Sequence, residues 1–187
     1  NPFADVKSTA YYADAVLWAA KEDITKGTTN TTFSPAGTLT RGQVVAMLYR
    51  MAGSPAVTAN TTGFSDVDNG AYYADAVKWA SGKEIVGGYA DGTFAPNRAI
   101  TREQLAAILY RYAKANGADI SVGEDTNLLS YKDFRSVGQY AVPALQWAVG
   151  SGLIGGTTNA MLSPKGTATR AQAAVILVRF VGMTAAK

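Results

Sequence analysis

The sequence predicts an all-α fold built from three copies of one helix–loop–helix unit, and three observations lead to this prediction. The motif Thr-Arg-x-Gln occurs at 40–43, 101–104 and 169–172, each time at the start of an apolar run. The surrounding residues recur at a nearly fixed offset, because Trp18 and Trp79 are 61 positions apart and the next Trp follows after 68. Apolar residues recur every three or four positions, as in an amphipathic helix. A fixed internal period indicates one supersecondary unit used repeatedly.

The first predicted helix of each unit is amphipathic. In the second unit, Asp75 and Lys78 lie off an apolar stripe with three- and four-residue spacing. The stripe consists of Tyr72, Tyr73, Ala76, Val77 and Ala80, matched in the first unit by Tyr11, Tyr12, Ala15, Val16 and Ala19. In the third unit Pro143 fits a helix if it lies in the first turn. We interpret the tyrosines at the starts of these helices mainly as packing residues: Tyr11, Tyr72 and Tyr140.

A turn-rich loop follows each first helix and in the second unit runs from Gly87 to Pro96. Gly permits positive φ, and Pro prevents the loop from continuing as a helix. One loop glycine recurs in every unit, as Gly27, Gly88 and Gly156. We expect the turn to require this glycine, with close approach of a ligand as a by-product.

The second helix of each unit begins at the Thr-Arg-x-Gln motif, which is a capping box. The Thr hydroxyl accepts a hydrogen bond from the third helical N–H, and the Gln side chain reaches back to the Thr N–H. The box does not explain Arg41, Arg102 and Arg170, because a cation at the first helical position faces the positive end of the helix dipole. We therefore expect each Arg to face an anion. As an exposed side chain, each should add little to stability.

The second helices carry an apolar stripe that a lone unit cannot cover. In the second unit it consists of Leu105, Ile108, Leu109 and Tyr112. We therefore expect the three units to pack on one another and to fold as one cooperative domain. The predicted units are 1–53, 62–114 and 129–183.

Composition limits the classes of function. With 187 residues, of which 48% are hydrophobic, the chain can bury a core. It has no Cys and no His, which excludes disulfides and thiolate metal sites and removes the commonest metal ligand and general base. We expect neither a cofactor nor a metal. The formal net charge is +3, but the basic residues are scattered, so nucleic acid is a poor candidate partner.

No apolar run approaches the ~18 residues of a membrane span, so we expect no membrane insertion. The N-terminal Asn-Pro-Phe-Ala-Asp lacks the charged and apolar regions of a signal peptide. The chain therefore reads as an excised or mature segment.

The second unit resembles one S-layer homology (SLH) motif from end to end. The matching runs are Phe64-Ser-Asp-Val, Tyr72-Tyr-Ala-Asp-Ala-Val-Lys-Trp-Ala, Gly87-Gly-Tyr-Ala-Asp-Gly-Thr-Phe-Ala-Pro and Ile100-Thr-Arg-Glu-Gln. Units one and three are divergent copies, and the three together cover almost the whole chain. The combined pattern is highly specific.

The resemblance implies an intrachain pseudo-trimer, with three SLH repeats around a pseudo-threefold axis, a central helical bundle, and a groove between each pair of neighbouring repeats. It also implies a non-catalytic anchoring module at the cell wall or S-layer surface of a bacterium. Such a module is covalently continuous with a larger exported protein. In that family the grooves bind secondary cell-wall polysaccharide, often with pyruvate ketals on N-acetylmannosamine, which makes an acidic polysaccharide the expected partner.

Four sets of positions carry over as implied ligand-binding residues. They are the arginines Arg41, Arg102 and Arg170, the aspartates Asp5, Asp66 and Asp133, the tryptophans Trp18, Trp79 and Trp147, and the glycines Gly27, Gly88 and Gly156. A ketal carboxylate suits a guanidinium, which can form two parallel hydrogen bonds, and helix-start amides would add donors. Asp can bond sugar hydroxyls, Trp offers a flat apolar face, and Gly lets the backbone come close.

The residue types leave alternatives open. The three Trp could belong to the core, and the three Asp could be helix caps or internal partners of the three Arg. Only the second unit has a Tyr and an Asp in its loop, at Tyr89 and Asp91. We therefore expect two or three grooves of unequal affinity, with the second unit closest to the family pattern.

Two other classes of function compete with anchoring. An enzyme without Cys or His would need paired carboxylates, and the repeated Asp has no second repeated carboxylate beside it. We therefore expect no catalysis. The stronger rival is a protein-interaction or self-assembly module at the cell surface, because helical repeats commonly bind proteins through their grooves.

Overall fold

The computed structural model describes residues 1–185, and within them the fold is all-α, as predicted. Six α-helices alternate between the first and second positions of the three units. They are α1 (Ala13–Lys21), α2 (Arg41–Met51), α3 (Ala74–Gly82), α4 (Arg102–Ala115), α5 (Val142–Gly150) and α6 (Arg170–Ala185). Four short 3₁₀ helices are added in the third unit and its connector, at Leu128–Ser130, Phe134–Ser136, Gln139–Ala141 and Thr158–Ala160. No helix of the described chain combines the length and apolar character needed to cross a membrane.

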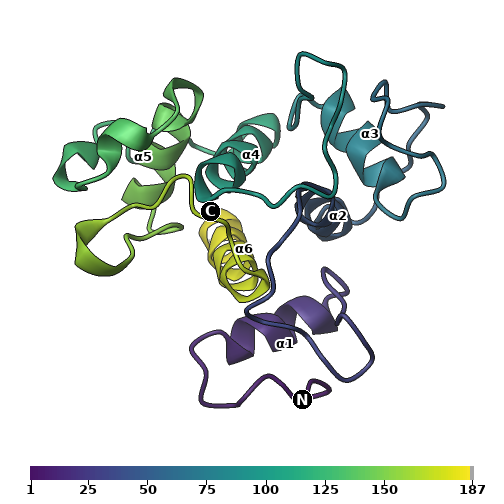
Figure 1. The fold of residues 1–187 in the computed structure, drawn as a ribbon, viewed down its shortest axis with the longest axis horizontal. Coiled ribbons are helices and arrows are strands. Elements are labelled where there is room, and N and C mark those ends of the chain that lie inside the picture. The colour runs from purple at the N-terminus through teal and green to yellow at the C-terminus, as the bar shows by residue number, and fades with distance from the viewer. Residues whose placement is uncertain (186–187) are drawn as a thin grey trace.

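The second helices α2, α4 and α6 lie together at the centre, and the first helices α1, α3 and α5 lie outside them (Figure 1). Each outer helix packs on the central helix of the preceding unit, in the pairs α3 with α2, α5 with α4, and α1 with α6. The last pair joins the first unit to the third and closes the circle. The apolar stripes are thus covered by neighbouring units, as the sequence predicted.

Capping boxes begin all three central helices. The hydroxyl of Thr40 accepts from the Gln43 N–H, and the Gln43 side chain accepts from the Thr40 N–H. The same reciprocal pair forms at Thr101. At α6, Thr169 and Gln172 form it again. The local start signal read from the sequence is therefore correct in every unit.

Beside the capping boxes, the backbones of three residues, one from each unit, close a hydrogen-bonded ring between the units. Leu39 N–H donates to the Ala168 carbonyl at 3.0 Å, and Ala168 N–H donates to the Ile100 carbonyl at 3.0 Å. Ile100 N–H returns to the Leu39 carbonyl at 2.9 Å. Because each unit donates once and accepts once, this ring has no free end.

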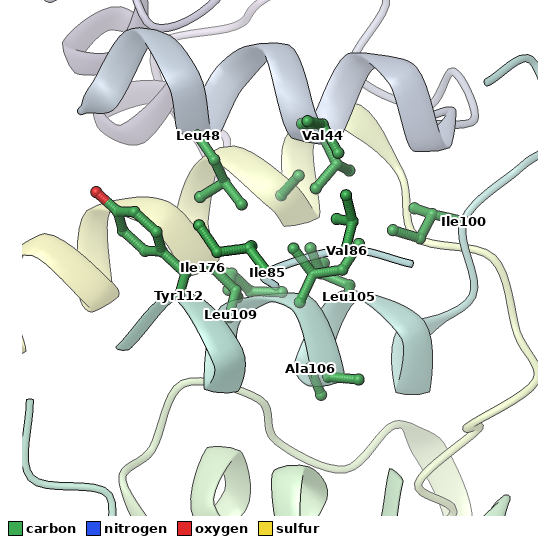
Figure 2. Close-up of a cluster of buried hydrophobic side chains, with 14 of the residues drawn as sticks. Val44, Leu48, Ile85, Val86, Ile100, Leu105, Ala106, Leu109, Tyr112 and Ile176 are labelled. Carbon is green, nitrogen blue, oxygen red and sulfur yellow. The ribbon is translucent and has the colours of Figure 1, made fainter. Parts of the chain in front are cut away.

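The main core is formed by the central helices together with α3, α5 and the adjoining loops. Figure 2 shows Val44 and Leu48 of α2 facing Leu105 and Leu109 of α4, with Ile176 of α6 among them. Fully burying such a side chain contributes roughly 1.5 to 3 kcal/mol. A smaller cluster lies under the first unit and includes Phe3, Val16, Phe33 and Ala174, so α6 contributes to it as well.

Candidate ligand-binding grooves

Three equivalent grooves surround the bundle, and each draws residues from all three units. We number a groove by the unit that supplies its loop. That unit also supplies a central helix, the preceding unit supplies the capping-box arginine, and the following unit supplies a tyrosine. The first groove contains Arg170, Gly27, Arg50 and Tyr72; the second Arg41, Gly88, Arg111 and Tyr140; the third Arg102, Gly156, Arg179 and Tyr11. Their volumes are ≈ 160, ≈ 180 and ≈ 440 Å³.

The capping-box arginines, called inner arginines below, are buried and bound to carbonyl oxygens. Arg41 is 7% exposed, and its Nε donates to the Phe94 carbonyl at 2.9 Å. Its Nη2 donates to the Gly87 carbonyl at 3.1 Å. Arg102 binds Leu162 and Gly155, and Arg170 binds Phe33 and Lys26, in the same way. Burial lowers the pKa of all three guanidinium groups.

This geometry corrects one expectation about the inner arginines, because they are buried and not exposed. Nε and Nη2 of each guanidinium bind carbonyl oxygens of the next unit, which leaves Nη1 for the expected anion. The helix-start amides are also occupied, since Arg41 N–H donates to the Arg98 carbonyl and Gly42 N–H to the Pro96 carbonyl. Equivalent amides at the starts of α4 and α6 bind carbonyls in the same manner. These amides are therefore not available as ligand donors.

The three aspartates secure the loops from within their own units. Asp66 accepts from the N–H groups of Phe94 and Ala95, both at 2.7 Å. Asp5 binds Phe33 and Ser34, and Asp133 binds Leu162 and Ser163, in the same arrangement. The bond from Phe33 N–H is the main cause that lowers the pKa of Asp5. No described Asp or Glu pairs with an inner arginine, so the alternative of an internal Arg–Asp ion pair is wrong.

The recurring glycines line the grooves, but their backbone does not require positive φ. Positive φ is found at other described glycines, such as Gly92 and Gly152. A Cβ on Gly88 would lie 2.7 Å from the Thr93 carbonyl and would also collide with the Phe64 ring. Equivalent collisions with the unit's first aromatic residue occur at Gly27 and Gly156. The reason for glycine is therefore close packing, not the turn conformation that we expected.

The tryptophans do not line any of the three grooves. Trp147 is 1% exposed, Trp79 is 8% exposed, and Trp18 packs partly buried against the main core. Trp79 contacts the rings of Tyr49 and Tyr112. The structure thus favours the core alternative for these residues.

Sequence reasoning missed two sets of groove residues. The tyrosines interpreted as packing residues are instead exposed by 74% at Tyr11, 62% at Tyr72 and 52% at Tyr140. A second arginine, the outer arginine, also lines each groove, nine positions after the inner arginine that begins the same helix. These outer arginines are Arg50, Arg111 and Arg179. Their offsets of 61 and 68 match the repeat, so the repeat itself could have identified them.

The grooves are electropositive. Among residues 1–185, the recorded ion pairs are Lys78 with Asp75 and Lys165 with Glu103, and neither involves a groove arginine. Each groove therefore contains two arginines that form no ion pair with a described carboxylate, although Asp133 and Asp5 act electrostatically on Arg102 and Arg170 from a greater distance. No group of three or more acidic side chains in the described chain is arranged to hold a metal ion.

The second groove has an additional aromatic cover. The ring of Tyr89 lies 5.1 Å from the guanidinium of Arg41 and 5.6 Å from that of Arg98. The guanidinium of Arg41 also lies 4.7 Å from the centre of the Phe94 ring. The single loop tyrosine thus distinguishes this groove chemically from the other two.

Comparison with known proteins agrees with the threefold repeat. A family model described as the S-layer homology domain matches residues 2–45, 63–106 and 130–174. An endoglucanase of Bacillus sp. (strain KSM-635) is 35% identical over 94% of this chain, which spans 18% of that relative. A cellulosome-anchoring protein of Acetivibrio thermocellus is 27% identical over 82% of this chain and 34% of its own length. A surface-layer 125 kDa protein of Lysinibacillus sphaericus is 27% identical over 94% of this chain and 14% of its own length.

Proposed function

The chain belongs to the S-layer homology domain family, and from this premise we propose that it is a non-catalytic anchoring module that binds an acidic cell-wall polysaccharide in its grooves. The family and the surface-layer and cellulosome-anchoring relatives indicate a cell-wall or cell-surface location. The chain spans only a small part of these relatives, which supports a segment of a larger exported protein.

The observation that carries the proposal is the pair of unpaired arginines in each groove. The inner arginine already gives Nε and Nη2 to carbonyl oxygens, and no described acceptor is recorded for its Nη1. The outer arginine lies on the same groove; Arg111, for example, is exposed. A guanidinium at an exposed site is well suited to a carboxylate, which it can bind with two parallel hydrogen bonds. In the second groove, Nη1 of the inner arginine and the guanidinium of Arg111 are thus open to an anion, whereas in the third groove Nη1 of Arg179 also donates to the carbonyls of Gly152 and Leu153, both at 3.5 Å.

The remaining groove groups suit a sugar that carries this anion. The exposed tyrosine offers a ring face and a hydroxyl, and Gln104 also lines the second groove, where its Nε2 donates to the Tyr89 hydroxyl at 3.4 Å. Aromatic faces pack against apolar sugar faces, while hydroxyl and amide groups bond polar substituents. We propose a saccharide with a fixed carboxylate, of which pyruvylated N-acetylmannosamine is the family example.

Calorimetric titration of the full chain tests this function. The probes are a methyl glycoside of 4,6-O-pyruvylated N-acetylmannosamine and the same glycoside with the carboxylate converted to its methyl ester. Removing the charge should weaken binding by ~1.5 to 3 kcal/mol, the value of a hydrogen bond to a charged group. Equal affinity for both probes would contradict a carboxylate-binding groove.

The alternative is a protein-interaction or self-assembly module. Exposed aromatic and Arg side chains are also enriched at protein interfaces, so groove composition alone does not separate the two. Pull-down on isolated cell walls does, with walls chemically stripped of polysaccharide as the control. The anchoring function requires loss of binding on stripped walls, whereas a protein-binding module would retain it.

Enzyme names among the relatives do not carry over to this chain. The endoglucanase and an exoglucanase of Acetivibrio thermocellus match it over 18% and 16% of their own lengths. The activities in those names belong to proteins that are mostly outside the match. A non-catalytic role for this segment is part of the proposal.

A further inference from the structure

Tyr140 differs from the other groove tyrosines because its hydroxyl has a protein partner. It donates to Oε1 of Glu103 at 3.0 Å. Glu103 is 3% exposed, and its Oε2 accepts from Gly138 N–H at 2.9 Å. Lys165 forms an ion pair with the same carboxylate. No hydroxyl partner is recorded for Tyr11 or Tyr72 within the described residues, so this fixed phenol is particular to the second groove.

Two sequence differences that occur together explain the contact. The residue equivalent to Glu103 is Gly42 in the first unit and Ala171 in the third. The residue that follows the groove tyrosine is Tyr73 in the second unit and Ala141 in the third. In the first groove, Tyr72 packs edge-on against Tyr73 with ring centroids 4.9 Å apart. Ala141 has no ring that could pack against Tyr140 in this way. Glu103 supports Tyr140 instead, through the hydrogen bond to its hydroxyl.

The two kinds of support compete for the same space. A Cβ on Gly42 would lie 3.1 Å from the Tyr73 ring, so a longer side chain there would require the ring to shift. Where the ring is absent, the carboxylate fits and is neutralised by Lys165. A buried carboxylate with three donors is stable only while these donors remain, which fixes the phenol orientation.

We propose that Glu103 is a positioning residue that makes Tyr140 a hydrogen-bond acceptor toward the ligand of the second groove. The single phenol proton is committed to Glu103, so the oxygen offers only lone pairs to a ligand. The second groove therefore selects a sugar hydroxyl or acetamide N–H beside the carboxylate, whereas Tyr11 and Tyr72 are free to donate to the carboxylate itself. This inference rests on the groove function proposed above.

The phenol keeps its proton under ordinary conditions. Burial and, after it, the hydrogen bond to Glu103 raise the pKa of Tyr140. The ionised form would place a second negative charge beside the Glu103 carboxylate, which is unfavourable. Tyr140 thus remains a neutral acceptor at the pH of binding experiments.

Site-resolved titration of the full chain tests the proposal. The protein is labelled with ¹³Cζ-tyrosine and titrated with the pyruvylated methyl glycoside. The NMR signal of Tyr89 reports on the second groove, and that of Tyr72 reports on the first. Glu103→Ala should weaken binding at Tyr89 by about fivefold to tenfold, the loss of one oriented hydrogen bond, and leave binding at Tyr72 unchanged. Glu103→Gln should stay within about twofold, because its amide oxygen can still accept the phenol proton.

Tyr140→Phe gives a second route, which removes the phenol donor but keeps the Glu103 carboxylate and its contacts with Gly138 and Lys165. It should cause the same loss at Tyr89, and the double variant with Glu103→Ala should be no weaker than either single variant, since both remove one interaction. Additive losses, equal losses in both grooves, or unchanged binding in Tyr140→Phe would overturn the proposal. Unchanged binding in Tyr140→Phe would overturn the proposal even if Glu103→Ala fails to fold.

A ligand-free measurement separates this inference from the groove function. In an alkaline titration, Tyr140 should ionise at higher pH than Tyr72, and Glu103→Ala should remove much of the difference. If the wild-type chain binds no probe in any groove, the proposed function fails and this inference fails with it, but the titration still shows whether the contact exists. If the probe binds and Tyr140 ionises together with Tyr72, the positioning role alone is wrong.

Discussion

The second and third grooves share one set of main-chain bonds around the inner arginine. In the second groove, Arg41 donates to the carbonyls of Phe94 and Gly87, and in the third, Arg102 donates to those of Leu162 and Gly155. Phe94 of the second unit corresponds to Leu162 of the third, yet the hydrogen bond from the arginine Nε is present in both grooves because its acceptor is a backbone oxygen. We call each inner arginine and the two carbonyl oxygens that it binds the frame of its groove. The frame thus tolerates changes of loop side chains.

The cover of the arginine, by contrast, differs completely. Rings of Tyr89 and Phe94 lie over Arg41, whereas no cation–π contact is recorded for Arg102 within residues 1–185. The equivalent positions in the third unit are Thr157 and Leu162. The comparison teaches that architecture and ligand chemistry use separate atoms of one loop: carbonyl oxygens hold the units together, and side chains define the groove.

The strongest test replaces the inner arginine in either groove. Arg41→Ala and Arg102→Ala each remove two charge-assisted hydrogen bonds and leave carbonyl oxygens unpaired. We expect each to lower the free energy of unfolding by about 3 to 5 kcal/mol, measured by urea denaturation. The two losses should agree within about 1 kcal/mol. A large loss at only one site would break the claim of a common frame.

Replacing an outer arginine should affect binding and leave the fold intact. Arg111→Ala removes an exposed guanidinium of the second groove, and it should weaken the pyruvylated probe there by about 1.5 to 3 kcal/mol. Its unfolding midpoint should stay close to that of wild type, because surface substitutions usually change stability by less than about 0.5 kcal/mol. Destabilisation comparable with Arg41→Ala would show that the outer arginine also belongs to the frame.

Glycine substitutions compare the packing under the two loops. Gly88→Ala places a Cβ against the Phe64 ring and the Thr93 carbonyl, so we expect a stability loss of about 1 to 3 kcal/mol. Gly156→Ala should cost less, because its closest neighbour is the edge of a Tyr131 ring at 2.8 Å. Gly87→Ala is the matched control, since nothing lies within 4 Å of its Cβ position. Similar losses at Gly87 and Gly88 would refute the packing explanation.

The smallest effect concerns the aromatic cover. Tyr89→Thr gives the second groove the residue of the third and removes a partly exposed cation–π contact, which should lower the free energy of unfolding by about 0.5 to 1 kcal/mol. The reverse change, Thr157→Tyr, should cause no loss of stability. Thermal unfolding of both variants provides the measurement. A loss above about 2 kcal/mol in Tyr89→Thr would mean that the ring supports the loop as well as covering Arg41.

The sequence predicted the fold well because each signal was local and appeared three times. Capping boxes, helical spacing and turn residues depend on neighbours within a few positions, and all three boxes formed as expected. Mutual covering of the units followed from the apolar stripes. The pairing of each outer helix with the preceding unit was not predictable, since nothing in a single stripe identifies its partner.

The site was predicted less completely. The positions of Arg41 and Gly88 in a groove were anticipated, but the partners of Arg41 were not, because a backbone carbonyl carries no side-chain signal in a sequence. The Trp79 position was misassigned to the ligand because an aromatic on an amphipathic helix reads the same in a core and in a groove. Arg111 was overlooked although the repeat marks it.

The closed ring of Leu39, Ile100 and Ala168 has a consequence for synthesis. A chain that emerges from a ribosome or a translocation pore exposes its first unit first, but α1 packs on α6, and Arg170 N–H and side chain bind the loop of the first unit. The hydrogen bond between Arg170 and Phe33, which are 137 positions apart, cannot form until α6 has emerged. The groove whose loop is encoded earliest therefore cannot be completed until the last helix has left the machinery that makes or exports the chain.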